Sequence, residues 1–102
     1  MSMLHTINKS PFERGVLETC LRLAKSGASV LLIEDGVYAA LAGTAKSELV
    51  EGHKADIKFY VLGVDLDARG LNEQPMIEGV ETVDYGGFVD LVTAHDAVHS
   101  WL

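Results

Sequence analysis

The stretch Ser29–Ile33, SVLLI, followed by Glu34-Asp35-Gly36, decides the fold class. The run does not alternate between polar and apolar side chains, which is typical of a strand buried on both faces of a parallel sheet. The two carboxylates and the glycine end the run and predict a tight turn. Short apolar runs at Met3–Ile7 and Ile57–Leu62 predict two further strands beside it.

Helical patterns separate these strands. Ser10-Pro11-Phe12-Glu13 has the layout of a capping box and predicts a helix over Pro11–Lys25, with Gly27 as its left-handed cap. Asp35, Asp65 and Asp84 each precede an apolar stretch and are expected to cap short helices. The remaining expected elements are helical segments at Val37–Leu41, Lys46–Glu51, Asp65–Gly70 and Gly86 or Gly87 through His95, and a short strand at Glu81–Asp84.

Strands that alternate with helices indicate an α/β fold. We expect one small domain over residues 1–102, with a mostly parallel sheet of four to five strands and helices on both faces. In such sheets ligands gather at the carboxyl ends of the strands. Those ends are Asn8-Lys9-Ser10, Glu34 to Tyr38, Gly63-Val64-Asp65 and Tyr85-Gly86.

Composition excludes several classes of protein. The chain has 102 residues with 8 basic and 15 acidic side chains, a formal net charge of −7, which argues against a general nucleic-acid binder. The single cysteine excludes an internal disulfide and a multi-cysteine metal cluster. No run approaches the ~20 apolar residues of a membrane span, and the first residues lack a signal-peptide layout. We therefore expect a cytoplasmic protein, and no cofactor motif is present.

Cys20 is the only thiol and the candidate catalytic residue. A reactive thiol must be an exposed thiolate, helped by a helix N-terminus or a nearby cation. In the predicted helix Cys20 lies about nine residues, or about 13 Å, from the start at ~1.5 Å per residue, too far for help from the helix dipole. Any activation would have to come from Arg14, Arg22, Lys25 or a neighbouring subunit. The alternative is a small buried apolar side chain.

Other polar residues have both a chemical and a structural interpretation. Glu34 and Asp35 could act as paired acid–base carboxylates, or Asp35 could only cap a helix. His95 and His99 have the i, i+4 spacing of metal ligands on a helix, but no third ligand is evident, so no metal site is expected. His5 is expected in the sheet as a structural histidine, and His53 is expected to be exposed.

Four stretches together resemble the DsrH/TusB family. The resemblance runs from Met3 to Leu102, in order and without large insertions. The matching stretches are Met3-Leu4-His5-Thr6-Ile7-Asn8-Lys9-Ser10-Pro11-Phe12, then Leu31-Leu32-Ile33-Glu34-Asp35-Gly36-Val37-Tyr38-Ala39-Ala40, then Tyr60-Val61-Leu62-Gly63-Val64-Asp65-Leu66-Asp67-Ala68-Arg69-Gly70-Leu71, and finally Asp84-Tyr85, Phe88-Val89, Leu91-Val92 and Trp101.

The resemblance implies a subunit of a cytoplasmic sulfur-relay complex. Members join DsrE-like and DsrF-like subunits, or their TusD and TusC counterparts, in a heterohexamer with two copies of each. The Dsr complex passes persulfide sulfur from a TusA-like donor to DsrC in sulfur oxidation, and the Tus complex serves 2-thiolation of the wobble uridine in tRNA. The main active cysteine of these complexes belongs to the DsrE-type partner. No direct contact of this chain with nucleic acid or membrane is expected.

Cys20 separates the two branches of the family. The resemblance implies that Dsr-type H subunits carry a cysteine at this helix position, whereas TusB-type proteins commonly do not. The expected function is therefore a DsrH-type subunit with a mainly structural role and Cys20 as an auxiliary persulfide carrier. The alternatives are a TusB-type subunit of tRNA thiolation and an assembly subunit without chemistry.

Overall fold

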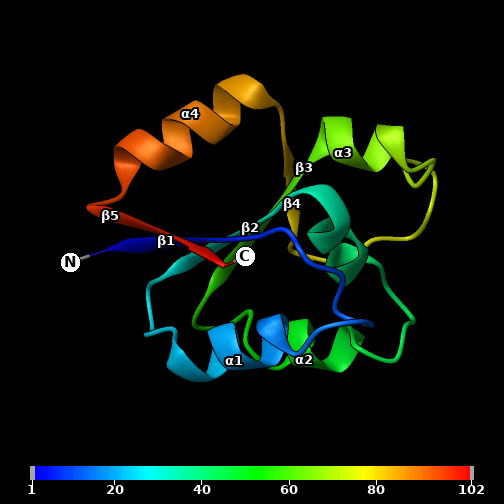
Figure 1. Cartoon of the computed structure of the whole chain (residues 1–102), viewed down its shortest axis with the longest axis horizontal. Helices are drawn as coiled ribbons and strands as arrows, with labels where there is room; N and C mark the ends of the chain where they lie inside the picture. Colours follow the sequence, from blue (N-terminus) through cyan, green and yellow to red (C-terminus); the bar gives the residue numbers. More distant parts are fainter. Residues whose placement is uncertain (1, 102) are drawn as a thin grey trace.

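The structure is a computed structural model that describes residues 2–101, so Met1 and Leu102, the ends of the expected domain, lie outside the described residues. Its centre is a parallel sheet of five strands in the order β4-β3-β2-β1-β5. The α/β class and the parallel neighbours β1, β2 and β3 are confirmed (Figure 1). The strands are β1 (Met3–Ile7), β2 (Ser29–Leu32), β3 (Lys58–Leu62), β4 (Glu81–Val83) and β5 (Ala97–Trp101).

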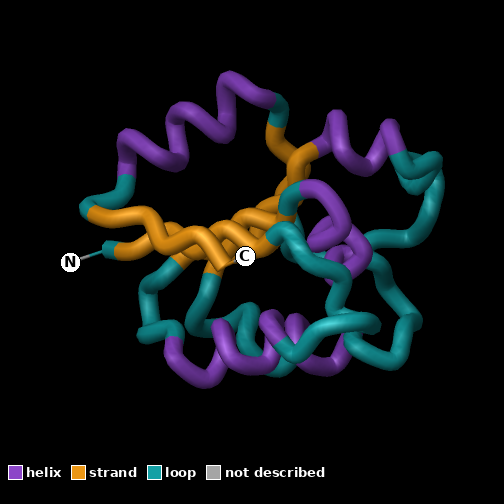
Figure 2. Tube along the Cα trace, in the orientation of Figure 1, coloured by secondary structure: helices purple, strands orange, loops and turns teal. Residues whose placement is uncertain are grey.

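Helices cover both faces of the sheet, as expected. Figures 1 and 2 show α1 and α2 on one face and α3 and α4 on the other. None of the helices between residues 2 and 101 has the length and apolar character needed to cross a bilayer. The helices are α1 (Val16–Leu23), the 3₁₀ helix η1 (Glu34–Ala40), α2 (Ser47–Glu51), α3 (Gly63–Ala68) and α4 (Tyr85–Ala94).

The central strands explain the apolar runs of the sequence. β2 has a strand on each side and helices over both faces, so all four of its residues are buried. Val30 and Leu32 belong to the core cluster that includes Leu17 and Cys20, whereas Leu31 alternates to the opposite face. Each such buried aliphatic side chain contributes about 1.5–3 kcal/mol relative to exposure.

The first helix begins later than the sequence predicts. Residues Pro11 to Glu13 form a turn instead, and α1 starts at Val16. The Ser10 side chain does not form the capping-box bond to Glu13: its Oγ accepts from the Phe12 N–H at 3.2 Å, and its carbonyl oxygen accepts from Glu13 and Arg14. The prediction of a helix over Pro11–Lys25 is therefore wrong at both ends, because the chain becomes extended at Ala24.

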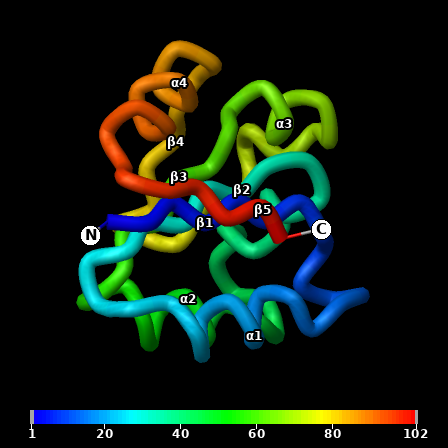
Figure 3. The backbone as a smooth tube through the Cα atoms, turned by 60° about the vertical axis from the view of Figure 1, so that its left-hand side comes forward, coloured from blue at the N-terminus to red at the C-terminus, as the bar shows by residue number. Residues whose placement is uncertain are grey.

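The fifth strand of the sheet, allowed for in the expected four to five, lies in a segment to which the sequence assigned no strand. α4 ends at Ala94, and Ala97–Trp101 turns back to pair with β1 along its whole length. The predicted helix cap at Asp84 is confirmed, since its Oδ1 accepts from the Gly87 N–H at 2.8 Å. Figure 3 shows β1 and β5 side by side, so the first and last strands of the chain are neighbours.

Candidate functional site

The turn after β2 is built around Gly36. A Cβ atom at this position would lie 2.1 Å from the carbonyl oxygen of Ile7, at the end of β1. The same oxygen accepts a hydrogen bond from the Ile33 N–H at 3.0 Å. Only glycine allows the backbone of η1 to approach β1 this closely. The glycine in the EDG motif is thus required by packing between the two central strand ends.

Glu34 holds an unusual backbone conformation at this turn. Its φ is +49°, in the left-handed region, which costs a non-glycine residue roughly 1–2 kcal/mol. Its N–H donates to Oδ2 of Asp65 on α3 at 2.7 Å. Asp65 therefore does not cap its own helix, as the sequence predicted, but satisfies the backbone of the neighbouring turn. This charge-assisted bond offsets part of the strain.

Asp35 forms an ion pair and caps no helix. Its Oδ1 lies 3.0 Å from Nε of Arg69, whose Nη1 also donates to the carbonyl oxygen of Asp65. η1 begins after an extended Ile33 without any side-chain cap, so the predicted cap at Asp35 is wrong. The Asp35 side chain is exposed, and such pairs contribute little, about 0–1 kcal/mol. Of the two adjacent acidic residues, Asp35 is therefore held through its carboxylate, whereas Glu34 is held through its backbone N–H.

A shallow groove of about 310 Å³ opens at this edge of the sheet. No cysteine or histidine lines the groove. Its lining residues are Ser10, Phe12, Glu13, Asp35 and Tyr38. The strand-end crevice of this chain thus offers hydroxyl and acidic groups but neither a thiol nor an imidazole.

Cys20 lies away from that crevice, in the second turn of α1. Because α1 starts at Val16, Cys20 is closer to the helix start than the sequence predicted, but it faces the core beside Leu17 and Leu21. The side chain is 0% exposed, and burial raises the pKa of the thiol to about 12. Arg22, one of the cations expected to activate the thiol, is exposed at the surface. Burial of the Cys20 side chain is the cause of its raised pKa. The geometry is that of a packed thiol.

An aromatic cluster joins the first and last strands. His5 is buried, and its Nδ1 accepts a hydrogen bond from Nε1–H of Trp101 at 3.0 Å. His99 stacks on Trp101 with ring centroids 4.4 Å apart. Burial, followed by the neighbouring His99, lowers the pKa of His5. The prediction that His5 is a structural histidine fits this geometry, but its partners were missed, because nothing in the sequence pairs β5 with β1.

The remaining histidines also serve the fold. His95 bridges Leu91 and β2, with Nδ1 2.7 Å from the Leu91 carbonyl oxygen and Nε2 2.9 Å from Ser29 Oγ. His99 lies on β5, so the expected i, i+4 pair does not share a helix face. His53 is half-buried, with Nδ1 2.8 Å from the Leu49 carbonyl oxygen. Among residues 2–101 no group of three His, Cys, Asp or Glu side chains could hold a metal ion.

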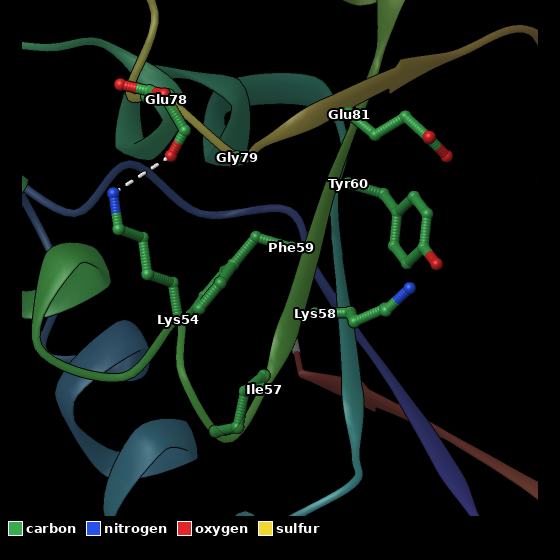
Figure 4. A pocket seen from close by; sticks show the side chains of 8 residues that line it. All are labelled: Lys54, Ile57, Lys58, Phe59, Tyr60, Glu78, Gly79 and Glu81. Atoms are coloured by element: carbon green, nitrogen blue, oxygen red, sulfur yellow. Dashed lines mark hydrogen bonds between the residues drawn. The ribbon is translucent and has the colours of Figure 1, made fainter.

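A second opening lies at the β3–β4 edge and was not expected from the sequence. It has a volume of about 420 Å³, and Figure 4 shows its lining side chains. Lys54 is already engaged, since its Nζ lies 2.8 Å from Glu51 Oε1 and 3.1 Å from the Glu78 carbonyl oxygen. Lys58, Tyr60 and Glu81 point away from Lys54 and Glu78 in this view. The mixed charges give this opening no preference for one sign of ligand.

The family model described as "DsrH like protein" matches residues 9–98. Two proteins named Protein TusB are similar over nearly the whole chain. The one from Pectobacterium parmentieri is 39% identical, covering 97% of this chain and 100% of its own length. The one from Erwinia tasmaniensis is 43% identical with the same coverage of both chains.

Solved structures agree on the fold. The ychN protein from E. coli superposes with a TM-score of 0.88 at 23% identity, covering 98% of both chains. Protein MTH1491 from Methanobacterium thermoautotrophicum, described as of unknown function, has a TM-score of 0.73 at 20% identity and covers 97% of both chains. At these identities the likeness concerns the fold alone.

Proposed function

Because the chain belongs to the DsrH/TusB family, as its family match and its full-length relatives show, we propose that it is a TusB-type subunit of a sulfur relay. The relay would supply sulfur for 2-thiolation of the wobble uridine in tRNA. The relatives support this alternative better than the sulfur-oxidation role expected from Cys20, because they carry the TusB name at 39% and 43% identity over the whole chain.

The proposed role within the relay is assembly without chemistry. The observation that carries it is the burial of Cys20, the only cysteine of the chain. A sulfur carrier must present a thiolate that can attack the outer sulfur of a donor persulfide. A thiol with 0% exposure and a pKa raised to about 12 does neither. The persulfide would then be carried by a cysteine of a partner subunit.

The partners in this proposal are the two related subunits of the same relay, of the TusC and TusD types, with two copies of each chain in the assembly. Family membership supports this partnership. The assembly would work in the cytoplasm, with sulfur entering and leaving through the partners. This chain would then hold the cysteine-bearing subunit in place.

One specific observation supports the Dsr-type function, namely the presence of Cys20 in α1. In that function the Cys20 thiolate attacks the outer sulfur of a donor persulfide, the donor thiolate leaves, and the sulfur passes on by the same exchange. The persulfide on Cys20 stays a prediction. It requires α1 to expose Sγ in the assembled complex.

One experiment separates these roles. This chain, either unchanged or as Cys20→Ser, is produced together with the two partner subunits from its own source in a bacterium that lacks TusB. The content of 2-thiouridine in the tRNA of that bacterium is then measured. We expect full thiolation with both chains. Absence of thiolation with the unchanged chain contradicts the tRNA role. The assembly role is contradicted if thiolation is lost with Cys20→Ser but not with the unchanged chain, and if the mass of the unchanged chain increases by one sulfur atom.

A further inference from the structure

Helix α4 is apolar but has no buried residue. Phe88 and Leu91 are half-buried, and His95 just beyond the helix bonds to the sheet through Ser29. A second apolar strip follows the helix at i, i+4 and i+7 spacing, so its members share one face. Its members are Tyr85, Val89 and Val92, which are 63%, 61% and 38% exposed.

The apolar strip continues onto both neighbouring elements. Exposed Val64 of α3 lines an open groove of about 470 Å³ together with Tyr85. At the other end of the strip lies exposed Val98 of β5. Val98 is in register with Leu4 of β1, and Leu4 is in register with Ser29 of β2, so the three side chains lie on the same face of the sheet. This is the face to which His95 bonds through Ser29. We call these five residues the α4 surface: Val64, Tyr85, Val89, Val92 and Val98.

Three acidic residues lie at the α4 surface, and the last third of the chain is acidic as a whole. From residue 70 to the end of the chain there are six acidic side chains and no lysine or arginine. Asp84 stands at the start of α4, Asp90 on the helix and Asp96 beyond its end. The last basic residue before this segment, Arg69, is paired with Asp35. Lys58, at the start of β3, lies on the same sheet face as Ser29 and is the nearby exception. The six acidic residues are Glu73, Glu78, Glu81, Asp84, Asp90 and Asp96.

We propose that the α4 surface docks a partner subunit whose facing surface is apolar and rimmed by lysine or arginine. An exposed apolar patch with a polar rim is the form of a protein interface. The acidic rim selects among occupants, because complementary charge favours the right partner and like charge disfavours others. A second copy of this chain, a nucleic acid and an anionic membrane would each bring negative charge to Asp84 and Asp90. The inference rests on the proposed function, and it names the surface and the charge of the partner.

The first test measures assembly of the full chain with its two partner subunits. All three are produced together, and the fraction of this chain bound to the tagged partners is compared between the unchanged protein, Val89→Asp and Leu23→Asp. Leu23 is the matched control, since it is 59% exposed but lies on α1, on the other face of the sheet. We expect about a tenfold weaker association for Val89→Asp and no change for Leu23→Asp.

The second test addresses charge and does not depend on the apolar strip. Asp90 is exposed on α4 and forms no side-chain ion pair among the described residues, so we expect Asp90→Lys to keep the fold. We expect weaker association for Asp90→Lys. We also expect association of the unchanged protein to weaken from about 0.1 M to about 1 M NaCl, as the Debye length falls from about 10 Å to about 3 Å.

The outcomes separate the two proposals. If the unchanged chain assembles with its partners but Val89→Asp and Asp90→Lys assemble equally well, the docking inference is overturned and the proposed function stands. If the unchanged chain alone forms a dimer that Val89→Asp dissolves, a second copy occupies the surface and the inference is overturned. If the unchanged chain binds neither partner, the proposed function fails first and the docking inference fails with it.

Discussion

The indole Nε1–H of Trp101 donates a hydrogen bond to Nδ1 of His5 across 3.0 Å. Because an indole nitrogen only donates, Nδ1 of His5 must be the unprotonated nitrogen of a neutral ring. The bond links β5 to β1 on the face that α1 covers. The protonation state of one buried histidine is thereby tied to the docking of the last strand.

Replacing Trp101 by Phe should destabilise the protein. The variant keeps an aromatic ring to stack on His99 but leaves Nδ1 of buried His5 without its donor. An unpaired buried acceptor costs about 1–3 kcal/mol, to be measured as the loss in free energy of unfolding by urea. Tyr60→Phe is the control, since the Tyr60 hydroxyl makes no hydrogen bond within the described residues. Equal losses in both variants would contradict the role of the Trp101–His5 bond.

Stability should fall as the pH is lowered through the range of histidine titration. Burial, and then the charge of His99, lowers the pKa of His5 in the folded protein, so the unfolded chain binds its proton first. The contribution of neutral His5 to the free energy of unfolding is therefore fully present above about pH 6.5. It declines below that pH and stops changing below the pKa of His5 in the folded protein. The free energy of unfolding is measured from about pH 7.5 to about pH 5, above the titration of most carboxylates. His5→Gln should flatten the decline, and an unchanged slope would refute the assignment.

Gly36→Ala should prevent normal folding or cost several kcal/mol. Its Cβ would lie 2.1 Å from the Ile7 carbonyl oxygen, which is backbone at the end of β1 and cannot move cheaply away from η1. Gly15→Ala is the matched control, because no atom lies within 4 Å of its Cβ position and its φ is −83°. Thermal unfolding monitored by circular dichroism compares the two. A Gly36→Ala protein as stable as Gly15→Ala would show that the turn can relax.

Alkylation of Cys20 by iodoacetamide near neutral pH should be slow in the folded protein. With a pKa of about 12, the thiolate amounts to about one part in 10⁵ at pH 7, and Sγ has no solvent exposure. The labelling rate should rise in urea in step with unfolding measured by circular dichroism. Rapid labelling without urea, before any loss of helix signal, would mean that α1 opens on its own and would favour the persulfide role.

Much of the sheet could be predicted because its signals are local. The run at Ser29–Ile33 is apolar without alternation, which is typical of a strand buried on both faces, and Met3–Ile7 is a short, mostly apolar run that ends at polar residues. The start of α1 was wrong because the Ser10 side chain accepts from the Phe12 N–H in a turn rather than from the Glu13 N–H of a capping box, and the sequence does not distinguish the two arrangements. β5 was missed because an edge strand with exposed Val98, His99 and Ser100 carries little apolar signal.

The polar contacts of the site could be predicted less well than the sheet. The sequence places Glu34, Asp35 and Asp65 at strand ends, but it does not show that Asp65 bonds to the Glu34 backbone rather than to its own helix. The sequence also does not show that Asp35 forms an ion pair with Arg69. These two residues are 34 positions apart in the chain. Such contacts depend on the relative placement of η1 and α3, which the sequence pattern does not specify.

The pairing of the first strand with the last has a mechanical consequence. β1 and β5 run parallel, with Met3 opposite Ala97 and Ile7 opposite Trp101. A force applied between Ser2 and Trp101 pulls the start of one strand and the end of its neighbour in opposite directions, which loads their evenly spaced hydrogen bonds in shear. The bonds must then break together rather than peel open one by one. The molecule should therefore resist stretching between its two ends more strongly than stretching across the β4 edge.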